Sequence, residues 1–229
     1  MMLSSIIPGV PIGELFGGDD PEAMSTALRL ILLITVLSLA PGILILMTCF
    51  TRIVVVLAFV RMGLATQQMP PNQVLIGLAL FLTFFIMSPV VSEMNEEALT
   101  PFLEGELDQE EAFEAAASPM KAFMADHTRE KDLALFLNYA ELEVPETIDD
   151  IPLSALVPAF AISELQTAFQ IGFLIFVPFL VIDMIVASVL MSMGMMMLPP
   201  VMISLPFKVL LFVLVDGWHL IVESLLISF

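Results

Sequence analysis

Apolar residues run through this chain in long uncharged stretches. Four of these stretches, residues 30–47, 62–92, 165–182 and 184–207, carry no ionisable side chain. A helix needs about 20 mainly apolar residues to cross the hydrocarbon core of a bilayer. The pattern therefore predicts four hydrophobic regions of membrane-type helix.

Proline and glycine divide the first half of the chain into a helical hairpin. Residues 26–66 could form one helix about 60 Å long, but Pro41 and Gly42 lie inside it. Proline removes a backbone donor and glycine loosens the chain, so we expect a kink or break there. A pair of prolines, Pro70 and Pro71, then turns the chain back on itself.

The second half repeats this plan. A helix begins near Pro158, Pro178 is expected to kink it, and a methionine-rich turn ends at Pro199 and Pro200. A last helix then reaches Phe229. The whole pattern predicts an all-α protein built from membrane-type helical hairpins.

An acidic insertion separates the two hairpins. Residues 93–150 hold 17 Asp and Glu against 3 Lys and Arg, and so carry most of the net charge of −18. The predicted segments are an N-terminal leader at 1–26, a first hairpin at 27–92, a small acidic helical insertion at 93–150, and a C-terminal hairpin at 151–229. The leader has no Lys or Arg and is broken by prolines. It is a poor match to a secretory signal, and we expect it to be retained.

The insertion is predicted to be helical. Ser118 before Pro119 suits a helix start, and a stripe that includes Leu133 and Leu137 has the spacing of a second helix. We interpret the acidic face as a solvated surface rather than a cation site, because no calcium-loop spacing is present. Asp132 is expected at the surface.

Basic residues indicate the orientation of the first hairpin. Arg52 and Arg61 precede its turn, and Lys and Arg concentrate on the cytoplasmic side of membrane proteins. The turn is therefore expected in the cytoplasm, and the acidic insertion on the outer side.

Composition agrees with lipid as the solvent. Hydrophobic residues make up 59% of the chain and charged residues 14%, against roughly half and a quarter in globular proteins. Cys49 is the single cysteine, so no internal disulfide is expected. Metal, redox and phosphate-loop motifs are absent from the sequence. We expect a protein that is not an enzyme, with no catalytic residues, no cofactor, no metal and no nucleic-acid partner.

Ionisable residues inside apolar helices are costly unless they are paired or wet. At 100° per residue, Lys208, Asp216, His219 and Glu223 lie at about 0°, 80°, 20° and 60° around the last helix. This spacing predicts one polar stripe on a continuous helix.

Two further acids, Glu164 and Asp183, lie in the preceding helices. Lys208 is the lone Lys or Arg in residues 151–229, so we expect it to pair with Glu164, or alternatively with Asp183. Such residues hold helices or copies together. A proton relay would use the same residue types, and the sequence leaves that alternative open.

Several segments of the second half resemble a known family. They are "PAFAISELQTAFQIGF" at 158–173, "PFLVIDMIVAS" at 178–188, "MGMMMLPP" at 193–200 and "LPFKVLLFVLVDGWHL" at 205–220. Together with the hairpin–insertion–hairpin layout, these resemble the FliP/SctR family of type III secretion export-gate proteins.

The resemblance implies a core channel subunit of the bacterial flagellar type III protein export gate. It implies a homopentamer joined by FliQ-like and FliR-like subunits, which conducts unfolded export substrates across the inner membrane at the flagellar basal body. The close match of residues 205–220 favours a flagellum over an injectisome. A gated small-solute channel or a proton-coupled transporter is the alternative, and an assembly scaffold without a pore is a third.

The methionine-rich turn is the candidate gate. Met193, Gly194, Met195, Met196 and Met197 would form a gasket around the channel axis, because thioether side chains are flexible and polarisable and can close tightly yet yield. The alternative is that these methionines fill gaps in an apolar core.

Overall fold

The computed structural model describes residues 21–66, 68–142, 145–195 and 197–229. The regular elements in these residues are all helical, which confirms the all-α prediction. Most of the expected leader lies outside the described residues, and so does Met196. The elements are α2 (Pro21–Met47), α3 (Phe50–Gly63), α4 (Asn72–Met94), the π-helix η1 (Asn95–Leu99), α5 (Thr100–Glu104), α6 (Gln109–Asp126), α7 (Glu130–Tyr139), α8 (Leu153–Ser192), α9 (Pro200–Leu214) and α10 (Gly217–Ile227).

The chain divides into two compact units, one ending at Leu44 and the other comprising Ile45–Phe229. Helix α2 runs through Pro41 to Met47, so the break expected at Pro41 and Gly42 lies instead at Thr48 and Cys49. There the Thr48 hydroxyl accepts a hydrogen bond from the Phe50 backbone N–H at 3.3 Å. A threonine side chain that bonds its neighbouring backbone competes with the helical ladder, which accounts for the position of the break.

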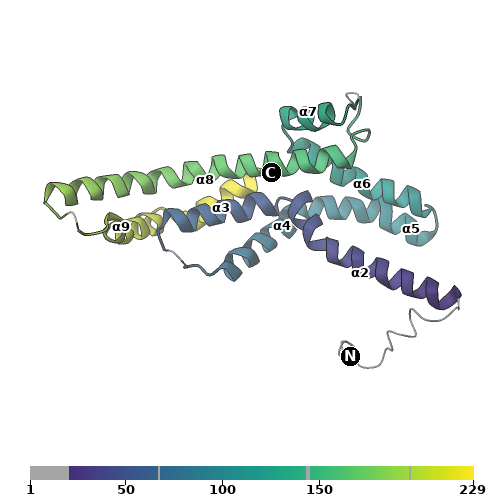
Figure 1. Cartoon of the computed structure of the whole chain (residues 1–229), viewed down its shortest axis with the longest axis horizontal. Helices are drawn as coiled ribbons and strands as arrows, with labels where there is room; N and C mark the ends of the chain where they lie inside the picture. The colour runs from purple at the N-terminus through teal and green to yellow at the C-terminus, as the bar shows by residue number, and fades with distance from the viewer. Residues whose placement is uncertain (1–20, 67, 143–144, 196) are drawn as a thin grey trace, which may run out of the picture. The chain divides into compact units, whose positions relative to one another are not determined.

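The centre of the second unit is the contact between α3 and α8 (Figure 1). Helix α3 buries the positions of one face, including Ile53, Val56, Leu57 and Val60. Glycines on both helices, Gly63 of α3 and Gly172 of α8, lie against a phenylalanine ring of the opposite helix and so let the two backbones approach closely. At Gly172 an added Cβ would come within 2.4 Å of the Phe59 ring.

The first hairpin turns where the sequence predicts. Helix α3 ends at Gly63 and α4 begins at Asn72, directly after the two prolines. Arg61 stabilises the turn, since its Nη1 donates to the Asn72 side chain and, at 3.3 Å, to the Pro70 carbonyl.

The acidic insertion begins as a continuation of α4 into η1 and α5, and α6 then starts earlier than predicted. The expected start at Ser118 is wrong, because α6 begins at Gln109 behind a capping box. The Asp108 carboxylate accepts the backbone N–H groups of Glu110 and Glu111, while the Glu111 carboxylate accepts the N–H of Asp108. This reciprocal cap satisfies helix donors that would otherwise lack partners.

Helix α7 packs on α8 through a buried polar contact. Ser163 on α8 donates to the Asp132 carboxylate at 2.7 Å and accepts the Arg129 backbone N–H at 3.1 Å. Asp132 also pairs with the Arg129 guanidinium. The prediction of Asp132 as a surface position is therefore wrong, whereas Tyr139 on the same helix is 90% exposed.

The second hairpin is longer and less regular than predicted. Helix α8 runs for 40 residues through both Pro158 and Pro178. The returning helix is divided into α9 and α10, whose axes differ by 62°. Asp216 at this break has φ 50°, in the left-handed region.

Three helical stretches in the described residues are long and apolar enough to cross a membrane, or four if α9 and α10 form one broken span. They are residues 30–47, 72–104 and 153–192. Only 11% of the most apolar window of α8, and none of that of residues 30–47, is buried in the chain. These exposed apolar faces require lipid or other subunits to cover them.

A side chain at Gly172 should disturb the α3–α8 contact. Gly172→Ala forces the Phe59 ring or a helix to move, and overpacking of this kind costs about 1–3 kcal/mol. Thermal unfolding of the purified chain in a non-ionic detergent should show a lower midpoint. Gly77→Ala is the matched control, since nothing lies within 4 Å of its added Cβ. Equal midpoints for the two variants would contradict the close packing.

The Asp132 contact should make the docking of α7 sensitive to acid. Partial burial alone would raise the pKa of Asp132, but the hydrogen bond from Ser163 and the Arg129 charge outweigh it and hold the pKa below its ordinary value of 3.8. A carboxyl with a lowered pKa contributes stability above its unfolded pKa of about 4 and loses it as the pH falls through the folded value.

Hydrogen–deuterium exchange of residues 130–139, corrected for intrinsic rates, measures this docking. Protection should be constant near neutral pH and decline below about pH 4. Asp132→Asn should lower protection at neutral pH and remove most of the pH dependence. Glu130→Gln, a change at an exposed carboxylate of the same helix, should leave the profile as in the unchanged chain; the opposite order of the two variants would refute the contact.

Candidate functional site

A buried ion pair joins α3 to α8. Arg52 is 3% exposed and Glu164 0%. The Arg52 Nε donates to Glu164 Oε2 at 2.9 Å, and its Nη2 donates to Glu164 Oε1. This two-pronged arrangement is the strongest geometry for an arginine–carboxylate pair, and it neutralises both charges inside an apolar contact.

The remaining guanidinium nitrogen of Arg52 binds the last residues of the chain. Its Nη1 donates to the Ser228 carbonyl at 2.7 Å and to the Ser228 hydroxyl at 3.2 Å. The Arg52 guanidinium carbon lies 3.8 Å from the centre of the Phe229 ring, a cation–π contact. One arginine therefore joins α3, α8 and the segment after α10.

Aromatic rings extend this junction into the acidic insertion. Phe229 stacks on Phe123 of α6 with ring centres 6.3 Å apart, and it contacts the His127 ring at 5.2 Å. His127 Nδ1 lies 2.8 Å from the Phe123 carbonyl oxygen. The insertion is thus packed against the end of the chain by rings rather than by its charges.

A second ion pair joins α8 to α9. The Lys208 Nζ donates to Asp183 Oδ2 at 2.6 Å, and the Ser204 hydroxyl donates to the other oxygen of Asp183. Lys208 is 2% exposed, whereas the Asp183 side chain is 26% exposed. The buried cation is thereby neutralised by an acid at the edge of the contact.

The preferred partner predicted for Lys208, Glu164, is wrong within this chain, and the alternative, Asp183, is the observed partner. In an antiparallel hairpin, residues at similar distances from the turn lie side by side, and Asp183 and Lys208 satisfy this condition. Glu164 lies 19 residues earlier on α8, roughly 28 Å along the helix axis. Glu164 pairs instead with Arg52, which the sequence had indicated only as evidence for the orientation of the first hairpin.

The polar stripe predicted on a continuous last helix is wrong. The chain bends by 62° between α9, which holds Lys208, and α10, which holds His219 and Glu223. Asp216 lies at the break itself with a positive φ, so the 100° periodicity does not carry through it. His219 and Glu223 are exposed, with Nε2 and Oε2 3.9 Å apart.

The methionine-rich turn lies between Ser192, where α8 ends, and Pro200, where α9 begins. The N–H of Gly194 bonds the Met191 carbonyl, and the N–H of Met195 bonds the Leu190 carbonyl, each at 3.0 Å. With φ +77° at Gly194, this is a Schellman end, which requires a residue that tolerates a left-handed backbone. Gly194 therefore makes the bend at the end of α8.

The described methionines of this turn do not fill the core of their own chain. Met193 is 56% exposed, Met195 39% and Met197 98%. Met196, the remaining member of the predicted gasket, lies outside the described residues. Their thioethers are available to lipid, to a second copy or to a passing polypeptide.

Metal binding has no support in the described part of the chain, where no group of three or more His, Cys, Asp or Glu side chains could hold an ion. In the described part of α8, both carboxylates, Glu164 and Asp183, are instead occupied by a cation. This arrangement serves to hold helices together.

Breaking the Arg52–Glu164 pair should destabilise the fold strongly. Glu164→Gln leaves the Arg52 charge buried and only partly compensated, and the loss of one partner of a buried pair costs about 3–5 kcal/mol. Denaturant unfolding in a non-ionic detergent measures the change in the free energy of unfolding.

The matched control is Glu223→Gln, the same chemical change at an exposed carboxylate, which should cost less than about 1 kcal/mol. Replacing both partners, as Arg52→Met with Glu164→Met, should cost less than the sum of the two single changes. Strict additivity, or equal effects of Glu164→Gln and Glu223→Gln, would show that the pair is not coupled.

Comparison with known proteins identifies relatives over nearly the whole chain. The model of the FliP family matches residues 33–225. The flagellar biosynthetic protein FliP of Bacillus subtilis is 71% identical over 216 residues, which cover 94% of this chain and 98% of the relative. Those of Pectobacterium carotovorum and Aquifex aeolicus are each 50% identical, covering 97% and 89% of this chain and 86% of each relative. The chain therefore belongs to the FliP family, as its motifs had indicated.

Proposed function

We propose that this chain is a membrane subunit of the flagellar protein export gate, and that several copies together surround a passage for unfolded flagellar proteins. Family membership and the name shared by its relatives, flagellar biosynthetic protein FliP, support a membrane component of the flagellar export apparatus. The finer proposal is that the chain forms the wall of the conduit and contributes to its closure. The bacterial inner membrane is the proposed location.

One observation carries this proposal: exposed methionine side chains cluster at the turn of a long apolar hairpin. Met193, Met195 and Met197 are all exposed in the described part of the chain. The hairpin that presents them is α8 and α9, which are mainly apolar and carry many exposed apolar side chains. A set of such hairpins side by side would bury these faces and bring the turns together.

The proposed assembly is a homopentamer with FliQ-like and FliR-like subunits. The apolar faces of residues 30–47 and of α8 support association, because they are too extensive for a water-soluble monomer. The acidic insertion is proposed to lie on the exported side and to help copies associate. Unfolded export substrates would pass along the axis.

The hairpin combines a rigid backbone near the turn with flexible methionine side chains at the turn itself. The Lys208–Asp183 pair fixes α9 against α8 close to the turn, and the Schellman bonds fix the backbone where α8 ends. The methionine side chains beyond this base keep their rotational freedom, since they are exposed. Apolar constrictions resist wetting and so block ions without a charge, while flexible thioethers can yield to a polypeptide.

A proton-coupled transporter receives less support from the same residues. Glu164 and Asp183 are the acids at membrane depth on α8, and each accepts hydrogen bonds from a cation. A carboxylate that joins two helices through a cation would break that contact on taking a proton. The pairs therefore favour a structural role over proton transfer.

Alanine in place of the turn methionines should open the closure selectively. Met193→Ala, Met195→Ala, Met196→Ala and Met197→Ala in combination would widen the constriction and remove its adaptable lining. Ion conductance across membranes that carry verified, fully assembled complexes should rise, while export of flagellar proteins is largely retained.

The control combination is Met184→Ala with Met202→Ala, which removes two exposed methionines outside the turn and should leave conductance unchanged. Loss of assembly without a leak would indicate that the turn only packs subunits together. Assembled alanine variants that stay tightly closed to ions would contradict the gasket.

A further inference from the structure

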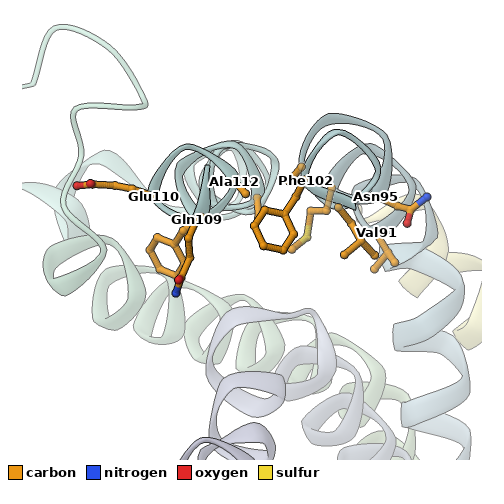
Figure 2. A pocket seen from close by; sticks show the side chains of 11 residues that line it. Val91, Asn95, Phe102, Gln109, Glu110 and Ala112 are labelled. Carbon is orange, nitrogen blue, oxygen red and sulfur yellow. The ribbon is translucent and has the colours of Figure 1, made fainter. Parts of the chain in front are cut away.

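An apolar groove lies in the acidic insertion, and the residues that line it are distant in sequence from the methionine turn. It has a volume of about 940 Å³ and is lined by the end of α4, by η1, by α5 and by the first half of α6. Figure 2 shows Phe102 pointing into the space between two helical segments, with Val91 and Asn95 on one side and Ala112 on the other. We refer to it as the α4–α6 groove.

The walls of this groove are large apolar side chains left open to solvent. Val91 is 56% exposed, Leu99 51%, Phe102 41% and Phe113 71%. Part of one wall is the π-helix η1, a rare geometry that recurs at functional sites. Several apolar side chains of a partner could therefore be buried here.

The charge around the groove has one sign. Residues 93–117 contain nine Asp and Glu and no Lys or Arg, and all nine are exposed. Glu110 stands at the α6 edge of the groove, with its carboxylate directed outward in Figure 2. An apolar groove with an acidic surround is complementary to an apolar helix face flanked by Lys and Arg.

The same charges argue against two other occupants. This density of exposed acids makes immersion of the groove in hydrocarbon costly, and it repels anionic lipid head groups. The insertion of a second copy would bring the same negative charge to the groove, so an association of copies through the insertion would use its other surfaces. Of its three cations, Lys121 donates to the Asp149 carbonyl at 2.6 Å and Arg129 pairs with Asp132, which leaves little positive charge to offer a neighbour.

We propose that the α4–α6 groove binds a basic amphipathic helix of a partner protein. The helix would insert its apolar face between η1 and α6 and place its Lys and Arg opposite the acidic surround, in the manner of other helix-in-groove complexes. This inference does not depend on the conduit, because binding at the groove can be measured without export or ion flow.

The test uses the full chain in a neutral, non-ionic detergent and a fluorescent peptide of about 16 residues, roughly four helical turns. The probe peptide has Leu at i, i+3, i+4 and i+7 and Lys elsewhere. One control peptide has the same composition in scrambled order, and a second has Glu in place of Lys. Fluorescence anisotropy should show binding of the basic amphipathic peptide, weaker binding at higher salt, and at least about tenfold weaker binding of both controls.

Variants of the chain locate the site. Ala112→Phe fills the groove and should weaken binding of the basic peptide about tenfold, and Glu110→Lys should weaken it severalfold. Their matched controls are Ala134→Phe and Glu141→Lys, the same changes at exposed positions that do not line the groove. Both controls should bind the peptide as the unchanged chain does.

A photo-crosslinking residue at Phe113 gives an independent location and should label the basic peptide. Binding unaffected by Ala112→Phe would overturn the proposal, and so would equal binding of the acidic peptide. It would also fail if a dimer of the chain were dispersed by Ala112→Phe while the basic peptide bound no better than its scrambled form, because the occupant would then be a second copy.

Discussion

The buried Arg52–Glu164 pair is the interaction on which the second unit of this protein depends. It lies within the α3–α8 contact, where neither charge can be solvated, so each side chain is tolerable only because the other is present. The same guanidinium holds Ser228 and covers the Phe229 ring. Phe229 in turn packs on Phe123 of α6, which connects the acidic insertion to the apolar hairpins. A single arginine thus connects, directly or through Phe229, segments from the start, the middle and the end of this unit.

This arrangement assigns different physical roles to the two ends of α8. Its first half is fixed by Glu164, which pairs with α3, by Ser163, which bonds Asp132 of α7, and by Gly172, which packs against α3. In its second half, which includes Asp183, more than half of the positions are exposed, and most of the exposed side chains are apolar. The firm end holds the unit together, and the exposed end is available to lipid and to other subunits. In the proposed export gate, this division lets the assembly stay intact while its closure yields.

Local features of the fold could be predicted from the sequence, because they depend on neighbouring residues. Pro70 and Pro71 make the first turn, Gly194 makes the second, and the stripe of Leu133 and Leu137 forms α7. The start of α6 could also have been predicted, since Asp108 and Glu111 have the spacing of a capping box.

Other features depend on contacts that periodicity does not encode. Arg52 and Glu164 are 112 residues apart, and a pairing at that distance has no local signal. The prediction of one polar stripe on the last helix was wrong because Asp216 has a left-handed conformation and the helix axis bends there. Residues before and after the bend therefore do not share one helix face. Asp132 has an ordinary acidic neighbourhood in sequence and is buried only because Ser163 of α8 lies opposite it.

In the proposed gate, the methionine turns of several copies meet at one axis. The decisive measurement is cysteine crosslinking in the assembled membrane complex, with Met197→Cys in a chain whose buried Cys49 is replaced by Ala. We expect efficient disulfide crosslinks between copies at Met197, and few at Met184→Cys, which is exposed on α8 outside the turn. Assembled complexes that form no crosslink between copies at Met197 would show that the turns do not meet.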